Sequence, residues 1–373
     1  MSRASAAKSE DASVAERLKG TRILLVGPSL RIMGGQAVQL DLLLRNLRAE
    51  GVDVDFLPVN PVPWGPLEYL TRVKYLRTLV VSIFYLAALL WRVRKHDLIH
   101  IFSASYFSFI LAPTPALLVA RLYGKRTILN YRSGEAEEHL QRSGRFVHNM
   151  LKRADKIVVP SAYLVEVFGR FGYKAQAVYN LSDPNQFVYR ERVPLRPRII
   201  VARNLEPLYD VGAAIRAFAE IKREHPQATL TVIGEGREAG KLRLLVKELG
   251  LADVTFTGRV ERARMPELYN EADIFLNSSI IDNMPVAIVE AFHAGLPVVT
   301  TNAGGIPYIV KHEVNGLLVE MRDYRGLAAA ANRLLADPEL SRRLIAEGRS
   351  WAEQCSWPQV RGRWAEIYRS VVS

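Results

Sequence analysis

The sequence predicts an α/β protein with two Rossmann-like domains, whose mostly parallel sheets face each other across a cleft. Three observations lead to this prediction. The chain has 373 residues, which is too long for one ordinary hydrophobic core and fits two domains. Short apolar runs of β type alternate with helical patterns in both halves, as in βαβ units. Between the halves, residues 182–197 are rich in Pro, Arg and polar side chains and lack periodicity, which is typical of a linker.

Each half contains six runs with strand character. In the first half they are Ile23–Val26, Val54–Leu57, Leu98–Phe102, Thr127–Asn130, Lys156–Val159 and Ala177–Tyr179. In the second half they are Ile199–Ala202, Thr229–Ile233, Val254–Thr257, Ile274–Leu276, Pro297–Thr300 and Gly316–Val319. Ligands of such folds bind at the carboxyl ends of the strands, so the cleft between the domains is the expected site.

The predicted domain boundaries follow from these runs. A disordered tail covers 1–20, the first domain 21–182, the linker 183–197, and the second domain 198–356. A last helix within 357–373 carries Trp364, Ile367 and Tyr368 at helical spacing. It either packs on the second domain or crosses back to the first.

The composition is that of a globular protein, with 49% hydrophobic and 24% charged residues. The single cysteine, Cys355, cannot form an internal disulfide, and no Cys/His cluster has metal-site spacing, which favours a reducing cytoplasm. The polar first 20 residues lack the apolar segment of a secretory signal. We therefore expect a cytoplasmic protein without a metal or other cofactor.

The net charge of +12 is concentrated in the first half. Residues 1–190 contain 26 Lys/Arg against 15 Asp/Glu, and residues 191–373 contain 24 against 23. This imbalance indicates an anionic partner, either an acidic acceptor, a phospholipid surface or nucleic acid, or else only a well-solvated basic surface. Nucleic acid is disfavoured, because no nucleic-acid-binding signature accompanies the charge.

Residues 274–307 form the most informative segment. Asp282 and Glu290 lie eight positions apart in a strand–loop–helix–strand unit, with the helix expected over Met284–His293. The first amides of a helix lack internal partners and lie at the positive end of its dipole, so they favour a bound diphosphate. Carboxylates accept hydrogen bonds from sugar and ribose hydroxyls. The segment therefore suggests a sugar-nucleotide site.

This segment resembles the retaining glycosyltransferases of family 4, which have the GT-B fold. The family pattern is Glu, seven residues, Glu, and then E-A-x-A-x-G-x-P-V-V and a Gly-Gly turn. The residues that match it here are Asp282, Glu290, Ala291, Gly295, Pro297, Val298, Val299, Gly304 and Gly305. The resemblance implies that Glu290 binds the ribose hydroxyls of a donor, and that Asp282 replaces a glutamate one methylene longer.

The resemblance implies further donor contacts. The loop ending in Gly34 and Gly35 faces the donor phosphates in the family, and glycines allow close backbone approach. Arg203 after its strand matches an arginine that pairs with the diphosphate. The turn at Arg259 resembles a segment whose backbone reads the nucleobase. The expected donor-binding set is Gly34, Gly35, Arg203, Gly234, Arg259, Asp282, Asn283, Met284, Pro285, Val286 and Glu290.

Two family residues are absent. A lysine usually follows the arginine by five or six residues, but this chain has Leu208-Tyr209-Asp210-Val211-Gly212. This absence removes a positive charge from the departing diphosphate, for which Arg237 is a candidate substitute beside its reading as a solvated arginine. The stretch Asn130–Glu135 also lacks the histidine found in many members, and His139 comes too late. Arg132 and Glu135 are the alternative acceptor-binding or proton-transfer groups there.

The segment Tyr69–Arg77 leads into the apolar run Leu79–Trp91, which ends at Arg92, Arg94 and Lys95. A run of about 13 apolar residues is too short to cross a bilayer. Its basic and aromatic flanks suit a helix set into a membrane interface, and burial against the first sheet is the alternative.

The leading hypothesis is a retaining, metal-independent glycosyltransferase that moves a sugar from a nucleotide-sugar donor to a glycan or lipid-linked acceptor. Its expected catalytic residues are Asp282, Glu290 and Arg203, with Arg132 and Glu135 as further candidates. The alternatives are an epimerase of the same fold and a non-catalytic sugar-nucleotide-binding scaffold. We expect a cytoplasmic location, peripheral to the inner membrane face through the basic first domain.

Overall fold

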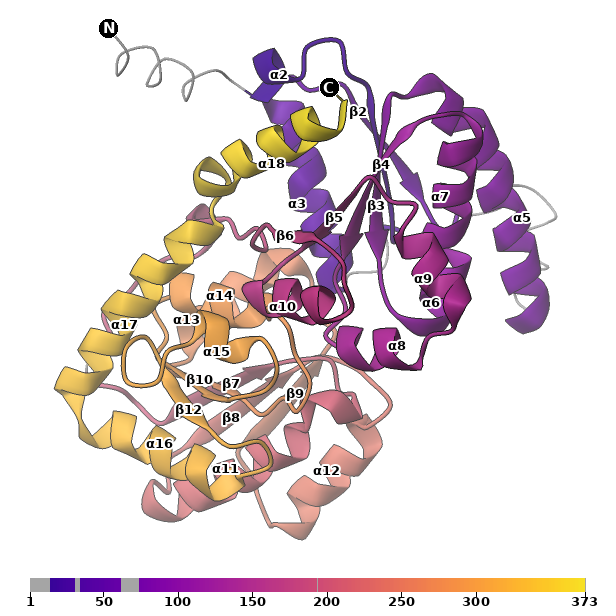
Figure 1. Ribbon diagram of the computed structural model, residues 1–373. Helices are drawn as coiled ribbons and strands as arrows, with labels where there is room; N and C mark the ends of the chain where they lie inside the picture. Colours follow the sequence, from indigo (N-terminus) through magenta and orange to yellow (C-terminus); the bar gives the residue numbers. More distant parts are fainter. Residues whose placement is uncertain (1–13, 31–33, 62–73, 193, 373) are drawn as a thin grey trace, which may run out of the picture. The chain divides into compact units, whose positions relative to one another are not determined.

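The computed structural model describes residues 14–30, 34–61, 74–192 and 194–372. The chain divides into two compact units (Figure 1). Unit 1 contains the residues up to Leu181 together with those from Trp357 onward, and unit 2 contains Ser182–Ser356. Each unit has one six-stranded parallel sheet, so the prediction of two Rossmann-like domains is confirmed.

The sheet of unit 1 has the strand order β2-β1-β3-β4-β5-β6. Its strands are β1 (Ile23–Gly27), β2 (Val54–Pro58), β3 (Leu98–Ser103), β4 (Arg126–Tyr131), β5 (Lys156–Val159) and β6 (Ala175–Ala177). Its helices are α2 (Val14–Arg17), α3 (Gly35–Ala49), α5 (Lys74–Arg92), α6 (Tyr106–Leu111), α7 (Pro113–Leu122), α8 (Ala136–Arg142), α9 (Arg145–Leu151), α10 (Ala162–Arg170) and α18 (Trp357–Val372), with a 3-10 turn, η1 (Val93–Lys95).

Side chains alternate along β1 between two hydrophobic clusters. Leu24 and Val26 lie in a cluster with α5, α7 and α10, whereas Ile23 and Leu25 lie in a cluster with α3 and α18. Successive side chains of a strand point to opposite faces, so helices cover both faces of this sheet. This double burial explains why the strands read as continuous apolar runs.

The predicted disordered tail over residues 1–20 is wrong for its last part. Residues 14–17 form α2, and Val14 and Leu18 are buried in the cluster that contains α18. Two apolar residues four positions apart suffice to dock one helical turn when a neighbouring helix covers them. Residues 1–13 lie outside the described part of the chain.

Helix α18 packs within unit 1, against α2, β3 and β4 (Figure 1). Its buried face contains Trp364 and Tyr368. The Tyr368 hydroxyl bonds His100 Nδ1 at 2.9 Å, and Asn130 Nδ2 lies 3.1 Å from His100 Nε2. A buried polar chain therefore ties the last helix of the sequence to the two central strands of unit 1.

The buried histidines of unit 1 predict acid sensitivity. Burial lowers the pKa of His100 to about 3 and that of His139 to about 4. The unfolded chain therefore binds more protons below a pH of about 6.5, and stability must fall as the pH drops from there toward 4. At pH 5 the expected loss in the free energy of unfolding is on the order of 3 kcal/mol relative to pH 7. Denaturant unfolding at the two pH values checks this, and His100→Gln should roughly halve the difference.

The sheet of unit 2 has the strand order β12-β11-β10-β7-β8-β9. Its strands are β7 (Arg198–Ala202), β8 (Thr229–Ile233), β9 (Val254–Gly258), β10 (Ile274–Asn277), β11 (Val298–Thr301) and β12 (Leu317–Val319). Its helices are α11 (Val211–Glu224), α12 (Ala239–Glu248), α13 (Met265–Glu271), α14 (Val286–His293), α15 (Ile306–Ile309), α16 (Tyr324–Ala336) and α17 (Pro338–Ala352). Its 3-10 turns are η2 (Pro184–Gln186), η3 (Pro207–Tyr209), η4 (Arg262–Arg264) and η5 (Glu353–Cys355).

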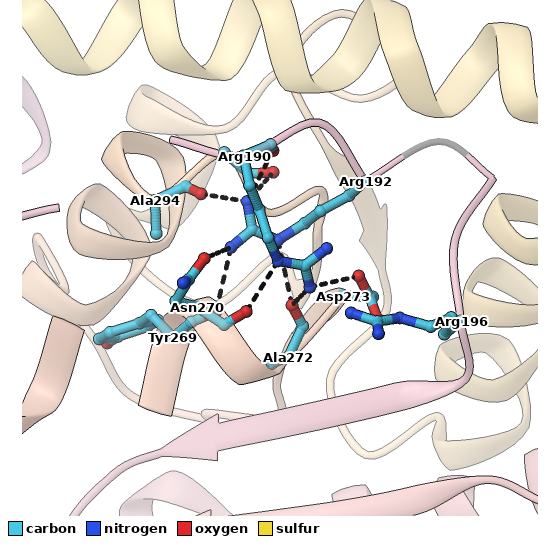
Figure 2. Close-up of polar contacts among 9 residues, drawn as sticks. Arg190, Arg192, Arg196, Tyr269, Asn270, Ala272, Asp273 and Ala294 are labelled. Atoms are coloured by element: carbon cyan, nitrogen blue, oxygen red, sulfur yellow. Dashed lines mark hydrogen bonds and ion pairs between the residues drawn. The ribbon is translucent and has the colours of Figure 1, made fainter. Parts of the chain in front are cut away.

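The segment predicted as a linker is held tightly on unit 2 by three arginines (Figure 2). The Asp273 carboxylate, 1% exposed, accepts from Arg190 at 2.7 Å and from Arg196 at 2.9 Å. Arg192 is 2% exposed, and its guanidinium donates to the carbonyls of Ala272 and Ala294 at 3.0 and 2.5 Å.

These two carbonyls lie just beyond the last residues of α13 and α14, where helical carbonyls lack intrahelical partners. A cation is stabilised at such helix ends. Arg192 additionally donates to the Tyr269 carbonyl and the Asn270 side chain at 3.3 Å each. Arg190 and Arg192 therefore fix the C-terminal ends of two helices, α13 and α14, which carry Tyr269 and Glu290.

Candidate functional site

The carboxyl edge of the unit 2 sheet brings Arg203, Asn277 and Asp282 together. Arg203 follows β7, Asn277 ends the neighbouring β10, and Asp282 lies in the loop after β10. Arg203 Nε donates to Asn277 Oδ1 at 2.8 Å, and its guanidinium pairs with the Asp282 carboxylate. The two charged side chains are only 10% and 12% exposed. Charge-assisted hydrogen bonds in such a partly buried setting hold the guanidinium in one orientation.

The loop that carries Asp282 is fixed by its backbone. The Asp282 carbonyl accepts from Gly305 N at 3.0 Å, and its carboxylate accepts from Asn283 N at 2.8 Å. A Cβ on Gly305 would lie 2.0 Å from the Asn283 carbonyl oxygen, so this position requires glycine. The Gly304–Gly305 turn therefore positions the acidic loop.

Glu290 lies in α14 and is held by Tyr269 of α13. The Tyr269 hydroxyl donates to Glu290 Oε2 at 3.1 Å, with the Ala287 carbonyl at 3.3 Å. Burial raises the pKa of Glu290, whereas Arg262, the Tyr269 hydrogen bond and Arg203 oppose that shift. A partly desolvated carboxylate with nearby arginines is suited to accept hydrogen bonds from hydroxyl groups of a ligand.

Helix α14 begins later than predicted. Met284 and Pro285 were expected inside it, but the helix spans Val286–His293 with Pro285 as its N-cap. Proline lacks an N–H and favours extended geometry, and Pro285 has φ −65° and ψ 114°. Asn283 and Met284 are buried before the helix, and Ile288 N already donates to the Pro285 carbonyl at 3.1 Å, so the amides at the open end of the helix are those of Val286 and Ala287.

Gly234 brings a second turn against this edge. It has φ +132°, and a Cβ there would lie 2.0 Å from the Arg203 carbonyl oxygen. Arg259 pairs with Glu235 at 3.3 Å, and Arg237 pairs with Glu206 at 2.9 Å. Both arginines are largely exposed, at 63% and 71%, so these pairs contribute little to stability.

The loop Leu208–Gly212, which lacks the lysine, is held against the segment that follows β10 by hydrogen bonds to its carbonyls. Its Leu208 carbonyl accepts from Ile280 N at 2.9 Å, and the Tyr209 carbonyl accepts from Ser278 Oγ at 3.0 Å. The Tyr209 ring centre lies 5.0 Å from the Arg203 guanidinium carbon. An aromatic face thus lies beside the arginine, where its negative quadrupole attracts the cation.

The remaining predicted residues lie in unit 1. Gly34 is the N-cap of α3 and Gly35 its first residue, and a Cβ on either would meet nothing within 4 Å. Packing within unit 1 therefore does not require glycine at these positions. The preceding residues 31–33 lie outside the described part of the chain.

Arg132 and Glu135 follow β4 in unit 1. Arg132 donates to Asn130 Oδ1 at 3.2 Å and pairs with Asn180, and burial lowers its pKa to about 9, so it stays charged at neutral pH. The Glu135 carboxylate lies 3.5 Å from Ser105 Oγ. His139 bonds the Tyr131 hydroxyl at 2.8 Å and is buried.

Tyr269, Asn277 and Arg262 belong to the site but were missed in the sequence. Tyr269 lies 21 positions before the carboxylate that it contacts, and Asn277 lies 74 positions after Arg203. No local pattern marks such pairs. A sequence signal existed for Tyr269 alone: it is the buried aromatic residue of the segment Met265–Glu271, which directly precedes β10.

In the described part of the chain, no group of three or more His, Cys, Asp or Glu residues is arranged to hold a metal ion. The site in unit 2 therefore consists of arginines, carboxylates, glycine turns and the amino end of α14. Such a set provides bidentate contacts for phosphate and acceptors for hydroxyl groups.

The Tyr269 hydroxyl predicts a measurable effect on Glu290. Tyr269→Phe removes a hydrogen bond that lowers the pKa of Glu290, so this pKa should rise further. We expect ligand affinity at neutral pH to fall about tenfold. The pH below which affinity is lost should also shift upward. Calorimetric titration across pH checks both, and an unchanged pH profile would show that Tyr269 only fills space.

Two family models match the chain, one in each half. The model described as Glycosyltransferase Family 4 matches residues 33–186, and the one described as Glycosyl transferases group 1 matches residues 189–351. Together they cover most of both units.

Among curated proteins, a GDP-mannose-dependent alpha-(1-6)-phosphatidylinositol monomannoside mannosyltransferase of Mycobacterium tuberculosis is 31% identical over 189 residues, covering 48% of this chain and 49% of that protein. Glycogen synthase of the same organism is 28% identical over 277 residues, covering 69% and 66%. The chain thus spans about half to two thirds of the length of these relatives.

Solved structures show the same fold. HepE of Anabaena in complex with UDP and glucose superimposes with a TM-score of 0.72 at 20% identity, covering 94% of this chain and 100% of that one. Sucrose-phosphate synthase of Thermosynechococcus elongatus gives 0.72 at 19% identity, covering 94% and 98%.

Proposed function

Because the chain belongs to the family 4 glycosyltransferases with the GT-B fold, we propose that it transfers a sugar from a nucleotide-sugar donor to a hydroxyl of a glycan or lipid-linked acceptor. The observation that most supports this activity is the pairing of Arg203 with Asp282 at the carboxyl edge of one sheet, with Glu290 near enough for the Arg203 cation to oppose the rise of its pKa. That edge is where parallel α/β sheets bind ligands.

Each group has a distinct role in the proposed reaction. Arg203 uses Nε and Nη2 for Asn277 and Asp282, and no described residue accepts a hydrogen bond from its Nη1. The N–H groups of Nη1, together with the amides at the start of α14, can therefore donate to the donor diphosphate. They would stabilise the negative charge that develops on the diphosphate as it departs. Glu290 accepts from the ribose hydroxyls, and Asp282 orients Arg203 and the sugar.

We further propose that the reaction retains the anomeric configuration and needs no metal. In this proposal a guanidinium and helix amides neutralise the diphosphate charge.

We propose uridine or guanosine as the donor's nucleoside, because HepE was solved with UDP-glucose and the mannosyltransferase is named for GDP-mannose. Gly34, Gly35, Arg132 and Glu135 are the proposed unit 1 contacts for donor or acceptor. The proposed location is the cytoplasm.

The loop Leu208–Gly212 favours a second candidate function. It lacks the lysine that family members usually have five or six residues after the arginine, and Arg237 is mostly exposed and paired with Glu206. A protein that binds the sugar nucleotide without transferring the sugar would tolerate this loss of charge at the leaving group.

A transfer assay separates these candidates. Radiolabelled UDP- and GDP-sugars are incubated with the chain, a chelator, and either glycan or lipid extracts as acceptors. The proposal predicts label in the acceptor, with the donor's anomeric configuration in the product by proton NMR. Conversion of donor without acceptor would indicate an epimerase, binding without turnover would indicate the scaffold, and chelator sensitivity would refute metal independence.

A further inference from the structure

Helix α5 of unit 1 has a row of large apolar side chains exposed on one side. Leu76, Leu79, Ile83, Leu86 and Leu90 recur at spacings of three and four residues, which places them along one face of the helix. Each is between 36% and 59% exposed. We call these five residues the α5 face. A contiguous apolar surface of this kind is uncommon on a monomeric protein and marks an interaction site.

The opposite side of α5 is fixed in the core. Tyr85 and Leu89, with Val93 of the following turn η1, are buried in the cluster shared with α7, and the Tyr85 hydroxyl donates to the Ala112 carbonyl at 2.8 Å. The helix therefore cannot rotate to bury the α5 face. The prediction that this segment is too short to cross a bilayer considered only Leu79–Trp91, whereas the longer stretch 76–95 is long and apolar enough to cross one, by length and composition alone. Spanning would remove the three core residues from unit 1, so the helix is built to lie on a surface.

The charged side chains of the α5 segment itself are all positive, and the nearest carboxylates are Asp97 and Asp55, which pair with Arg22 and His96 beyond its C-terminal end. Residues 74–95 contain no Asp or Glu, and Arg77, Arg94 and Lys95 are exposed toward the two ends of the helix. Trp91 is 53% exposed at the C-terminal end, with Lys95 Nζ 3.7 Å from its ring centre. Tryptophan and basic residues that flank an apolar face are typical of helices in a membrane interface.

The neighbouring helix α7 has the same character. It packs against α5 (Figure 1), and its Leu118 and Leu122 are 41% and 71% exposed. Arg121 and Lys125 accompany them, and residues 98–134 contain no acid.

We propose that the α5 face docks unit 1 onto a bilayer that contains anionic lipid. The apolar row enters the interface, while Arg77, Arg94 and Lys95 contact lipid headgroups. A second copy of the chain is a poorer occupant. Antiparallel pairing of two α5 helices would place Arg77 beside the partner's Arg94 and Lys95, and like charges repel. The docking is independent of the proposed transferase reaction.

Vesicle sedimentation of the full chain tests the proposal. The chain is mixed with phosphatidylcholine vesicles, with or without about 30% phosphatidylglycerol, at low and at about 500 mM salt. We expect binding to the anionic vesicles at low salt and at least tenfold weaker binding at high salt. The triple variant Leu79→Gln, Ile83→Gln, Leu86→Gln and the double variant Arg94→Ala, Lys95→Ala should each bind at least tenfold more weakly.

Leu244→Gln is the matched control, because Leu244 is an exposed leucine (61%) on α12 of unit 2. It should bind like the wild type, and all variants should melt like the wild type, because the replaced side chains are exposed. A wild-type chain that stays in the supernatant with both vesicle types overturns the proposal. So does a triple variant that binds normally, or a dimer that the triple variant dissociates in the absence of vesicle binding.

Discussion

Glu290→Gln is expected to lower nucleotide-sugar affinity by roughly a hundredfold. The substitution removes the charge and one acceptor from a group proposed to bind two ribose hydroxyls, and charge-assisted hydrogen bonds contribute about 1.5–3 kcal/mol each. The fold should survive. Burial raises the pKa of Glu290, which means that the ionised form is costly in the folded state, and glutamine avoids that cost. Calorimetric titration with the donor measures the loss.

Two further variants make this result specific. Glu347→Gln changes an exposed helical glutamate of unit 2 and should leave donor affinity unchanged. Glu290→Ala should abolish donor binding and also lower stability, because it leaves the Tyr269 hydroxyl without its carboxylate. If Glu290→Gln binds the donor as tightly as the wild type, Glu290 does not belong to the site.

Arg192→Met should destabilise unit 2 by about 3–5 kcal/mol, the range for removing one member of a buried hydrogen-bonded charge cluster. Methionine conserves much of the volume but leaves the carbonyls of Ala272 and Ala294 without their donor. Burial and, to a lesser extent, the neighbouring cation of Arg190 already lower the pKa of Arg192 to about 10. The expected fall in melting temperature is roughly 10 °C, measured by scanning calorimetry.

Arg223→Met is the control for Arg192. Arg223 is 73% exposed and pairs with Glu220 three residues earlier in the same helix, so its removal should cost less than about 0.5 kcal/mol. If Arg192→Met melts like this control, then Arg192 contributes little to the stability of unit 2 and does not hold the ends of α13 and α14.

The sheets could be predicted from the sequence because strands that are covered by helices on both faces appear as continuous apolar runs. Each of the twelve strands in the described part of the chain was identified, and most boundaries agree within one residue. The sixth was placed at Ala177–Tyr179, whereas β6 is Ala175–Ala177. Val178 is buried just beyond the end of this edge strand, so the apolar residue marked its end and not its centre.

The arginine segment could not be predicted, because its signal resembles that of a linker. Arg190, Arg192 and Arg196 read as solvated residues in a Pro-rich stretch. Their partners are a buried aspartate and backbone carbonyls at helix ends, and carbonyls have no sequence signature. The burial of a guanidinium depends on where helices end in space, which composition does not encode.

The candidate site was only partly accessible from sequence. Asp282 and Glu290 were found through their spacing, and Arg203 through the family resemblance, which implies an arginine after this strand. Asn277 lies in the site because β10 is the neighbour of β7 in the sheet, and Tyr269 because α13 lies close to α14. Only the fold reveals these two residues. The glycine at 305 was noted as a turn, but its need for close approach to Asn283 is visible only in space.

The measurement that tests the central claim most directly is a calorimetric titration of the purified full chain with UDP, GDP and ADP and their sugar conjugates in the presence of a chelator. The account predicts that one base binds, that its sugar conjugate binds at the same site, and that chelation leaves the affinity unchanged. Absence of binding by every nucleotide, with a folded chain, would contradict the assignment of unit 2 as a nucleotide-sugar domain.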